Sequence, residues 1–401
     1  MVNTPQRIYK FPADWESSVG LVDFPWPERT VALPPGKDTD SAIEYLLTEQ
    51  YPIDHNRLIS KSRLMKRIYY SLKPRLPRSL QLQIQKVSMH AHRSIRFPRE
   101  PFEPLMPDLL DFHLEAIARA RRSDRIPCMS FWPDGYQAAF CFTHDVETQY
   151  GYECLPELVE LERTYGVRST INIVPERYDW DIRFLSDLMK EGFEIGIHGL
   201  KHDMRLFESR EIFEQRCEKL KKYSDQIGAC GFRSPGLQRY YPWMKDLPGI
   251  YDSSFPDVET HLICPGGCCH ILPWFIGKNE KVEIPVTMPQ DHYLFNLRTE
   301  ASAKGWFDKW RIIRARGGLG CVIVHPDYID HKRMFEELLS LVTDDSRVWV
   351  TTASEVATWW LERSRAELVE KDGGYFITGS KRAQMGFLKT EDLNWTSNNR
   401  V

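Results

Sequence analysis

The sequence predicts an α/β protein whose main part is a distorted (β/α) barrel of about seven strands, and two observations carry this prediction. From about Ala138 onward, short apolar segments alternate with amphipathic helical patterns. Ionisable residues then follow directly on three of the apolar segments: His144 and Asp145, His198, and His325. Because a barrel carries its chemistry at the carboxyl ends of its strands, the two observations agree with each other.

Each element is predicted from its hydrophobic pattern and its flanking residues. We expect strands at Ala138–Phe142, Ser169–Val174, Phe193–Ile197, Val282–Val286, Gly320–Val324 and Arg347–Val350, with a weaker one near Gly231. We expect helices at Leu155–Tyr165, Asp181–Glu191, Glu208–Ile227, Thr299–Arg316 and Met334–Val342. A capping box at Thr352-Ala-Ser-Glu355 predicts a last helix that runs to Arg363.

The composition is that of an ordinary globular protein, with 401 residues, 42% hydrophobic and 27% charged. The first residues lack the apolar core of a signal peptide, and no segment reaches about 18 uninterrupted apolar residues, so we expect no membrane span. Nine scattered cysteines favour reduced thiols and a cytoplasmic protein. We expect no nucleic-acid partner.

Three parts are expected: an N-terminal extension that is partly helical and basic (1–130), a barrel (131–364) and a C-terminal hairpin and tail (365–401). From His55 to Arg99 the chain has twelve Lys and Arg and no Asp or Glu, which gives this stretch a formal charge of +12. Because the net charge of the whole chain is −3, the remaining residues together carry −15. Such a basic amphipathic stretch (55–99) either packs on the acidic body or binds an anionic surface, such as the inner face of a membrane.

His198 and His202, four residues apart, lie on one face if the chain turns helical there, and together with a carboxylate they suit a divalent metal. Such a pair alone is weak evidence. It is strengthened by an ordered set of motifs: Phe232-Arg233-Ser-Pro-Gly236, Tyr251-Asp252-Ser-Ser254, Glu283-Ile-Pro-Val286 and Val322-Ile-Val-His325-Pro326.

This ordered set resembles the polysaccharide deacetylase family (carbohydrate esterase family 4), over roughly residues 131 to 363. The resemblance implies a distorted barrel that holds one divalent metal ion, commonly zinc, and removes an N-acetyl group from a sugar. It implies that Asp145, His198 and His202 bind the metal. It also implies functional roles for Arg233, Asp252 and His325.

These residue types suit amide hydrolysis. Two neutral imidazoles and a carboxylate leave positions on a metal for water and a substrate carbonyl. His325 is the expected acid for the departing amine, because imidazolium donates readily near neutral pH. Arg233 is expected to orient a carboxylate and Asp252 to hold Arg233, unless the two simply brace their loops.

The sequence departs from the family at His144, which stands where the family carries its catalytic Asp base. His144 is expected to act as the base, although a fourth metal ligand or a site without activity are alternatives, and Glu147 is another source of a carboxylate. A second group, Cys264-Pro-Gly-Gly-Cys268-Cys269-His270, is interpreted as a loop with reduced cysteines rather than a second metal site.

The expected function is metal-dependent hydrolysis of an amide C–N bond, namely N-deacetylation of an acylamino sugar or glycan in bacterial polysaccharide biosynthesis. Two alternatives stay open at this point: a catalytically inactive sugar-binding or assembly protein that keeps the barrel, and an amidohydrolase of a small nitrogenous metabolite.

Overall fold

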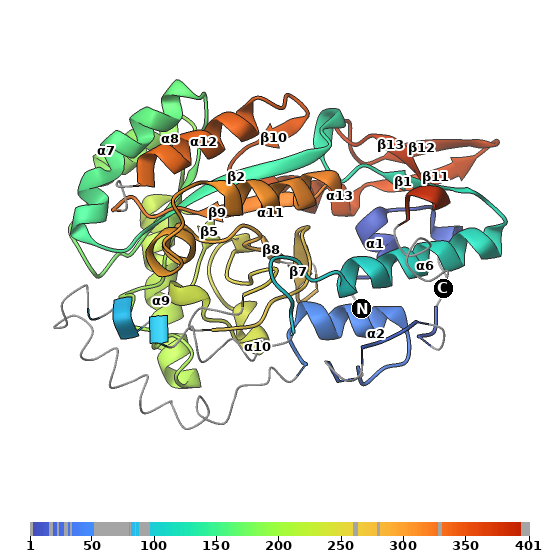
Figure 1. Ribbon diagram of the computed structural model, residues 1–401, viewed down its shortest axis with the longest axis horizontal. Coiled ribbons are helices and arrows are strands. Elements are labelled where there is room, and N and C mark those ends of the chain that lie inside the picture. The colour runs from blue at the N-terminus through green and yellow to red at the C-terminus, as the bar shows by residue number, and fades with distance from the viewer. Residues whose placement is uncertain are drawn as a thin grey trace.

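The protein is described here by a computed structural model. It describes residues 3–15, 19–21, 24–27, 31–32, 34–51, 97–259, 264–278, 281–327 and 331–393, with a few residues between 80 and 87. A curled sheet surrounded by helices occupies the left of Figure 1, and three helices of the N-terminal extension, α1 (Pro5–Tyr9), α2 (Thr39–Leu47) and α6 (Leu105–Arg121), lie together at the right. The basic stretch 55–99 lies almost wholly outside the described residues, so its two interpretations both stay predictions.

The main sheet confirms the predicted distorted (β/α) barrel. It contains one antiparallel strand, β7 (Trp274–Ile276), and otherwise only parallel pairs. The parallel strands are β2 (Ala138–Val146), β3 (Thr170–Ile173), β4 (Glu194–Ile197), β5 (Gly231–Phe232), β6 (Tyr251–Asp252), β8 (Lys281–Glu283), β9 (Leu319–Ile323) and β10 (Val348–Val350).

Strand β2 pairs with three other strands of this sheet. One edge of β2 pairs with β9, and the other edge pairs first with β10 and then with β3, after which the order is β4, β5, β6, β8 and β7. The curl closes where the amides of Thr287 and Met288 donate to the Cys321 carbonyl of β9, at 3.2 and 3.1 Å. Every residue of β2 is buried, as the apolar segment predicts.

The predicted strands are all present, but β6 and β7 were not predicted because two or three residues show no readable alternation. The predicted helices are present too. They are α7 (Gln149–Thr164), α8 (Ile182–Lys190), α9 (Arg210–Ile227), α11 (Lys304–Ala315), α12 (Lys332–Thr343) and α13 (Ala353–Arg365). The Thr352 side chain caps α13 by accepting from the Glu355 amide, as the capping box predicts.

The N-terminal extension packs on the barrel through a shared hydrophobic core. Its helices are α1 (Pro5–Tyr9), α2 (Thr39–Leu47) and α6 (Leu105–Arg121). A largely buried ion pair joins the two parts, because Arg239, six residues after Arg233, donates to both carboxylate oxygens of Glu49. The extension is therefore anchored beside the loop that follows β5.

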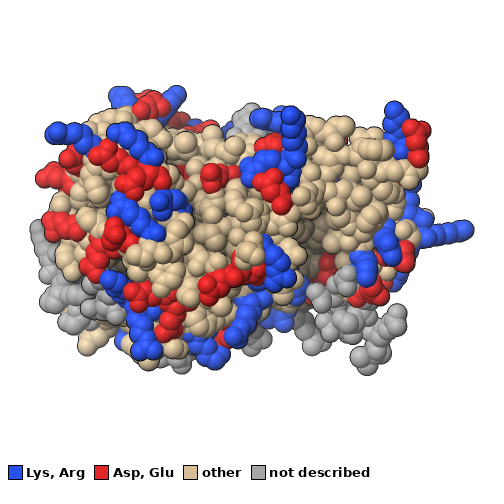
Figure 2. All heavy atoms as spheres, turned by 90° about the horizontal axis from the view of Figure 1, so that it is seen from above, with Lys and Arg blue, Asp and Glu red and all other residues tan. Residues whose placement is uncertain are grey.

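The C-terminal part contains the expected hairpin, β11 (Glu367–Lys371) with β12 (Gly374–Thr378). A further strand, β13 (Met385–Lys389), pairs antiparallel with β1 (Arg125–Met129), which precedes the barrel. Among the described helices, none combines the length and apolarity that a bilayer crossing requires. Figure 2 shows acidic and basic side chains interspersed on one face, without a surface of single sign.

A stability prediction follows from His113, which links α6 to α2 through a 2.7 Å hydrogen bond between Nδ1 and the Thr39 hydroxyl. Burial lowers the pKa of His113 to about 4. A depressed histidine pKa gives stability that is present above pH 6.5 and is lost as the pH falls toward 4. We expect His113 to account for a loss of about 2 kcal/mol in unfolding free energy between pH 7 and pH 5.

Urea unfolding at both pH values measures this loss. The His113→Gln variant should show a smaller pH dependence than the wild type, whatever its stability at pH 7. An equal pH dependence in the two proteins would contradict the assignment.

Candidate active site

The candidate site is built on the carboxyl end of β2. Side chains of a strand alternate between its two faces, so Thr143 and Asp145 share one face and His144 lies on the other. The structure continues this alternation to Glu147, directly after the strand, which points to the same group of residues as Asp145. The site therefore contains every second residue of this segment, namely Thr143, Asp145 and Glu147.

His144 does not take the position expected for a base. Its ring is fully buried. Nδ1 lies 3.0 Å from the Val324 carbonyl, and Nε2 lies 2.9 Å from a carboxylate oxygen of Glu162 in α7. Both ring nitrogens are engaged on the far face of β2, so this structure does not support a role for His144 as base or fourth ligand.

The partners of His144 indicate its protonation. A carbonyl only accepts, so Nδ1 must carry a proton. Glu162 accepts a hydrogen bond from the Ser169 hydroxyl through its other oxygen, at 2.6 Å. Because His144 Nε2 and the remaining oxygen of Glu162 are 2.9 Å apart, one more proton must lie between these two atoms. The pair holds the carbonyl of Val324, which directly precedes His325.

The group that could hold a metal consists of Glu147, His198 and His202, whose ligand atoms all lie within 4.8 Å of one another. His202 Nε2 is 2.8 Å and His198 Nε2 is 3.8 Å from the same oxygen of Glu147. His198 Nδ1 faces the Arg233 carbonyl at 3.2 Å, which places the proton on Nδ1 and leaves Nε2 to bind a metal.

This group fits a divalent transition metal. The Nε2 atom of His198 is buried and makes no hydrogen bond within the described structure, which is the state expected of a metal-binding nitrogen. Burial lowers the pKa of His202, which favours the neutral form that binds metals. Two imidazoles and one carboxylate leave room for further ligands. Glu147 thus takes the place that the sequence analysis gave to Asp145.

The two histidines meet through an irregular turn and not through a helix. Gly199 and His202 both have positive φ, 66° and 52°. Their rings nevertheless come together, with centroids 5.1 Å apart. The structure brings the two rings together without a helical turn, because β4 ends at Ile197 and residues with positive φ follow.

Asp145 lies beside this group and outside it. Its Oδ1 accepts from Asn172 of β3 at 3.0 Å and from Arg233 at 3.1 Å, while its Oδ2 lies 3.8 Å from His198 Nε2. Burial alone would raise the pKa of Asp145, but the neighbouring His198, Arg233 and His325 outweigh it and lower the value to about 2. Asp145 is therefore a carboxylate at neutral pH.

Arg233 orients the Asp145 carboxylate, as expected, but Asp252 does not hold Arg233. The buried guanidinium donates to the Thr143 hydroxyl at 2.6 Å, to the Ser253 carbonyl at 2.9 Å and to the Ser253 hydroxyl at 2.8 Å. Ser253, the residue after Asp252, therefore holds Arg233 in place of Asp252.

Asp252 instead faces Glu283, its register partner on β8. Both carboxyl groups are buried, and both accept from the Ser254 amide. Burial and the adjacent Asp252 raise the pKa of Glu283 well above its usual value. The two carboxyl groups connect β6 to β8 through the Ser254 amide, which donates to both.

His325 is held by a residue that the sequence analysis missed, Asp291. One oxygen of Asp291 is 2.7 Å from His325 Nδ1, and the other accepts from the His325 amide at 2.6 Å. This contact leaves Nε2 directed to the site, 3.5 Å from Glu147. The only sequence signal was an acidic residue a few positions beyond the predicted strand Val282–Val286.

The loop that contains Cys264 to His270 shows no metal group. Cys268 and Cys269 are buried, and their thiols contact the carbonyls of His270 and Gly267. Within the described part of the chain, only Glu147, His198 and His202 form a group of metal-binding side chains.

Solved structures similar to this chain include polysaccharide deacetylases, the family that the sequence resembles. A protein described as a polysaccharide deacetylase from Mycobacterium smegmatis is 18% identical, with a TM-score of 0.45 over 57% of this chain and 91% of the other. Another from Pseudomonas aeruginosa is 14% identical (TM-score 0.46), and Puue allantoinase is 14% identical (TM-score 0.47), each over 57% of this chain and 92% of the other. No family model and no curated protein matches the sequence.

The geometry predicts which carboxylate binds metal. His198→Ala, His202→Ala and Glu147→Ala should each lose most of the bound metal, because each removes one of three ligands. Asp145→Asn should keep it, because Asp145 lies outside the group. Metal content after dialysis, measured by mass spectrometry on protein that circular dichroism shows to be folded, distinguishes the two carboxylates. Loss of metal in Asp145→Asn with retention in Glu147→Ala would restore the ligand set expected from the sequence.

A second prediction concerns His144. His144→Ala should keep its metal but lose about 3–5 kcal/mol of unfolding free energy, because it leaves Glu162 and the Val324 carbonyl buried without their partner. His144→Asp should not raise turnover. Chemical denaturation measures the loss, and a base facing the reacting water would instead leave the stability nearly unchanged.

Proposed function

We propose that the chain is a metal-dependent hydrolase of amide bonds that removes the N-acetyl group of an acylamino sugar. The observation that carries this proposal is the placement of Asp145. Its carboxylate is held by Arg233 and Asn172 beside a group of two histidines and a glutamate, and His325 Nε2 lies 3.5 Å from Glu147 in that group. An ionised carboxylate, a metal-binding group and a held imidazole are the three components that metal-assisted hydrolysis requires.

Glu147, His198 and His202 would hold the metal. When bound, a divalent ion there would supply polarisation of the amide carbonyl and would make water acidic enough to attack near neutral pH. The Arg233 carbonyl accepts the proton on His198 Nδ1, which leaves Nε2 as the nitrogen that would bind the metal.

Asp145 is the base in this proposal, in place of His144. Its Oδ1 is occupied by Asn172 and Arg233, so its Oδ2, which lies near His198, is the oxygen that takes the proton of the attacking water. Arg233 keeps this carboxylate ionised and prevents it from rotating, because the guanidinium is itself held by Thr143 and Ser253. A base must be ionised and correctly oriented before it can act.

His325 is the acid that protonates the departing amine. Asp291 holds the proton of Nδ1, so only Nε2 exchanges a proton with the substrate. The same carboxylate stabilises the imidazolium that His325 must become before it donates. The amide C–N bond then breaks with the proton from Nε2 on the nitrogen, and acetate leaves with the oxygen of the water.

An acylamino sugar is the substrate favoured by the ordered motifs of the sequence, which resemble those of polysaccharide deacetylases. We propose polysaccharide biosynthesis as the setting of the reaction, on the basis of the same resemblance. An inactive binding protein would have no need to keep an ionised carboxylate and a held imidazole beside a metal-binding group.

Acetate release from an N-acetylglucosamine tetramer by the zinc-loaded protein tests this proposal. Asp145→Asn and His325→Gln should each lower kcat at least about 100-fold, as expected for loss of a general base or acid. Each variant should keep its metal. Asp145→Asn leaves the buried Arg233 without its counter-charge and should melt at a lower temperature, so kcat is measured on protein that circular dichroism shows to be folded. Arg311→Gln, an exposed position on α11, is the matched control and should retain full activity.

Two outcomes contradict the proposal. Wild-type turnover that persists in both Asp145→Asn and His325→Gln would mean that other residues carry the chemistry. No acetate release from any N-acetylated sugar, by protein that holds zinc, would favour the inactive sugar-binding protein.

A further inference from the structure

Two side chains hold the peptide bond between Val324 and His325. Strand β9 ends one residue before Val324, so this peptide bond lies beyond the strand. The Val324 carbonyl accepts from His144 Nδ1 at 3.0 Å, and the His325 amide donates to Asp291 at 2.6 Å. Because the C=O and N–H groups of a planar trans peptide point in opposite directions, the two side chains hold this peptide plane from opposite sides.

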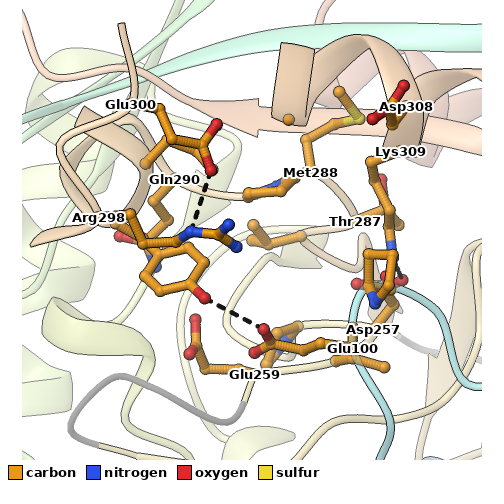
Figure 3. Close-up of a pocket in the computed structure, with 18 of the residues that line it drawn as sticks. Glu100, Asp257, Glu259, Thr287, Met288, Gln290, Arg298, Glu300, Asp308 and Lys309 are labelled. Atoms are coloured by element: carbon orange, nitrogen blue, oxygen red, sulfur yellow. Dashed lines mark hydrogen bonds and ion pairs between the residues drawn. The ribbon is translucent and has the colours of Figure 1, made fainter. Parts of the chain in front are cut away.

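The support on the Asp291 side borders open space. Asp291 follows the segment Thr287–Gln290, whose residues line a cavity of about 550 Å³ (Figure 3). The side chain of Asp291 is itself buried, but the chain that carries it has this cavity along one side. Packing therefore restrains this side of the peptide plane less than a filled core would, because atoms that face a cavity have fewer neighbours.

The support on the His144 side lies inside the core. The ring of His144 is fully buried, and its Nε2 is 2.9 Å from Glu162. The ring also meets Phe335 of α12 edge to face, with the two ring centroids 5.9 Å apart. Glu162 in turn accepts from the Ser169 hydroxyl at 2.6 Å. The His144 ring therefore cannot turn away from the Val324 carbonyl without losing several contacts.

A polar pair is costly at this place in the core. Phe140 and Phe142 lie on the same face of β2 as His144, and both belong to a hydrophobic cluster. An apolar side chain in place of His144 would continue this cluster, without the desolvation of an imidazole and of the Glu162 carboxyl group. Packing therefore does not explain the pair, whereas the need of the Val324 carbonyl for a rigidly held donor does.

We propose that His144 and Glu162 are positioning residues for His325. The pair fixes the peptide plane from which the His325 side chain extends, by holding the carbonyl of the preceding residue. This inference rests on the proposed function, in which His325 Nε2 protonates the departing amine. Asp291 orients the ring of His325, and the buried pair fixes the backbone that carries this ring. His144 lies on the far face of β2 and acts on the substrate only through His325.

Two variants of nearly equal size separate the hydrogen bond from the packing. His144→Asn keeps a donor near the position of Nδ1 for the Val324 carbonyl, whereas His144→Leu fills similar space without a donor. Both remove the partner of Glu162, so they share that cost. On the N-acetylglucosamine tetramer, the folded, zinc-loaded His144→Leu protein should lose at least about tenfold in kcat, because a displacement of about 1 Å suffices for such a loss. His144→Asn should recover most of it.

A double-mutant cycle tests whether this loss passes through His325. In the His325→Gln variant the acid is already absent, so the addition of His144→Leu should change kcat by less than about twofold. Glu162→Met keeps the His144 donor but releases its ring, and it should lower kcat about threefold or more. This loss should also vanish in His325→Gln. Because Glu162 lies on α7, this variant tests the inference even where His144→Leu does not fold.

Phe142→Leu is the matched control. It removes packing from the same buried face of β2, where Phe142 also contacts Phe335. Its side chain has no polar atom, so its loss leaves the Val324 carbonyl with its donor. The folded variant should keep kcat within about twofold of the wild type, even where its melting temperature is lower.

Crystal structures of the His144→Leu and His144→Asn variants supply a readout that needs no turnover. In the wild type, His325 Nε2 lies 3.5 Å from Glu147. It should move by about 1 Å in His144→Leu and stay in place in His144→Asn.

The outcomes separate this inference from the proposed function. Equal losses of kcat in His144→Asn and His144→Leu, additive losses in the cycle, or an unmoved His325 in His144→Leu would each overturn the inference, even where acetate is released. A displaced His325 in His144→Leu, in a protein that releases no acetate from any N-acetylated sugar, would support the positioning role and reject the hydrolase.

Discussion

The structure of the site depends on one buried cation, the guanidinium of Arg233. It is almost inaccessible to water, so its charge must be compensated inside the protein. Asp145 supplies the opposite charge, while Thr143 and Ser253 accept the other hydrogen bonds. These partners come from β2 and from the end of β6, and Arg233 itself follows β5. One side chain thereby connects three strand ends, and the carbonyl of the same residue orients His198.

The barrel could be predicted from the sequence because it depends on local patterns. Apolar strands and amphipathic helices bury their residues according to periods of two and 3.6, and these periods are visible over four or more residues. Strands β6 and β7, of two and three residues, show no such period and were missed. Strands β8 and β10 are equally short but were predicted, because each overlaps a longer apolar segment. The position of His325 after β9 was predictable for the same reason.

The carboxylate that belongs to the metal-binding group was harder to predict than the barrel. The alternation of side chains along β2 would have indicated it. The sequence analysis ended this strand at Phe142 and gave a role in the site to both His144 and Asp145. The strand continues to Val146, and strict alternation then selects Asp145 and Glu147 and excludes His144. Partners that come from elsewhere in the chain could not be predicted at all. Asp291 reaches His325 only because the segment after β8 closes the barrel against β9.

The ion pair between Arg239 and Glu49 has a consequence for how such a protein can change during evolution. Arg239 belongs to the barrel loop that follows the Arg233 motif, whereas its only carboxylate partner among the described residues comes from the extension. Exchange of the extension for an unrelated module would leave a guanidinium buried without its counter-charge, at a serious cost in stability. The two parts are therefore inherited together, and Arg239 and Glu49 should change in concert among descendants of this chain.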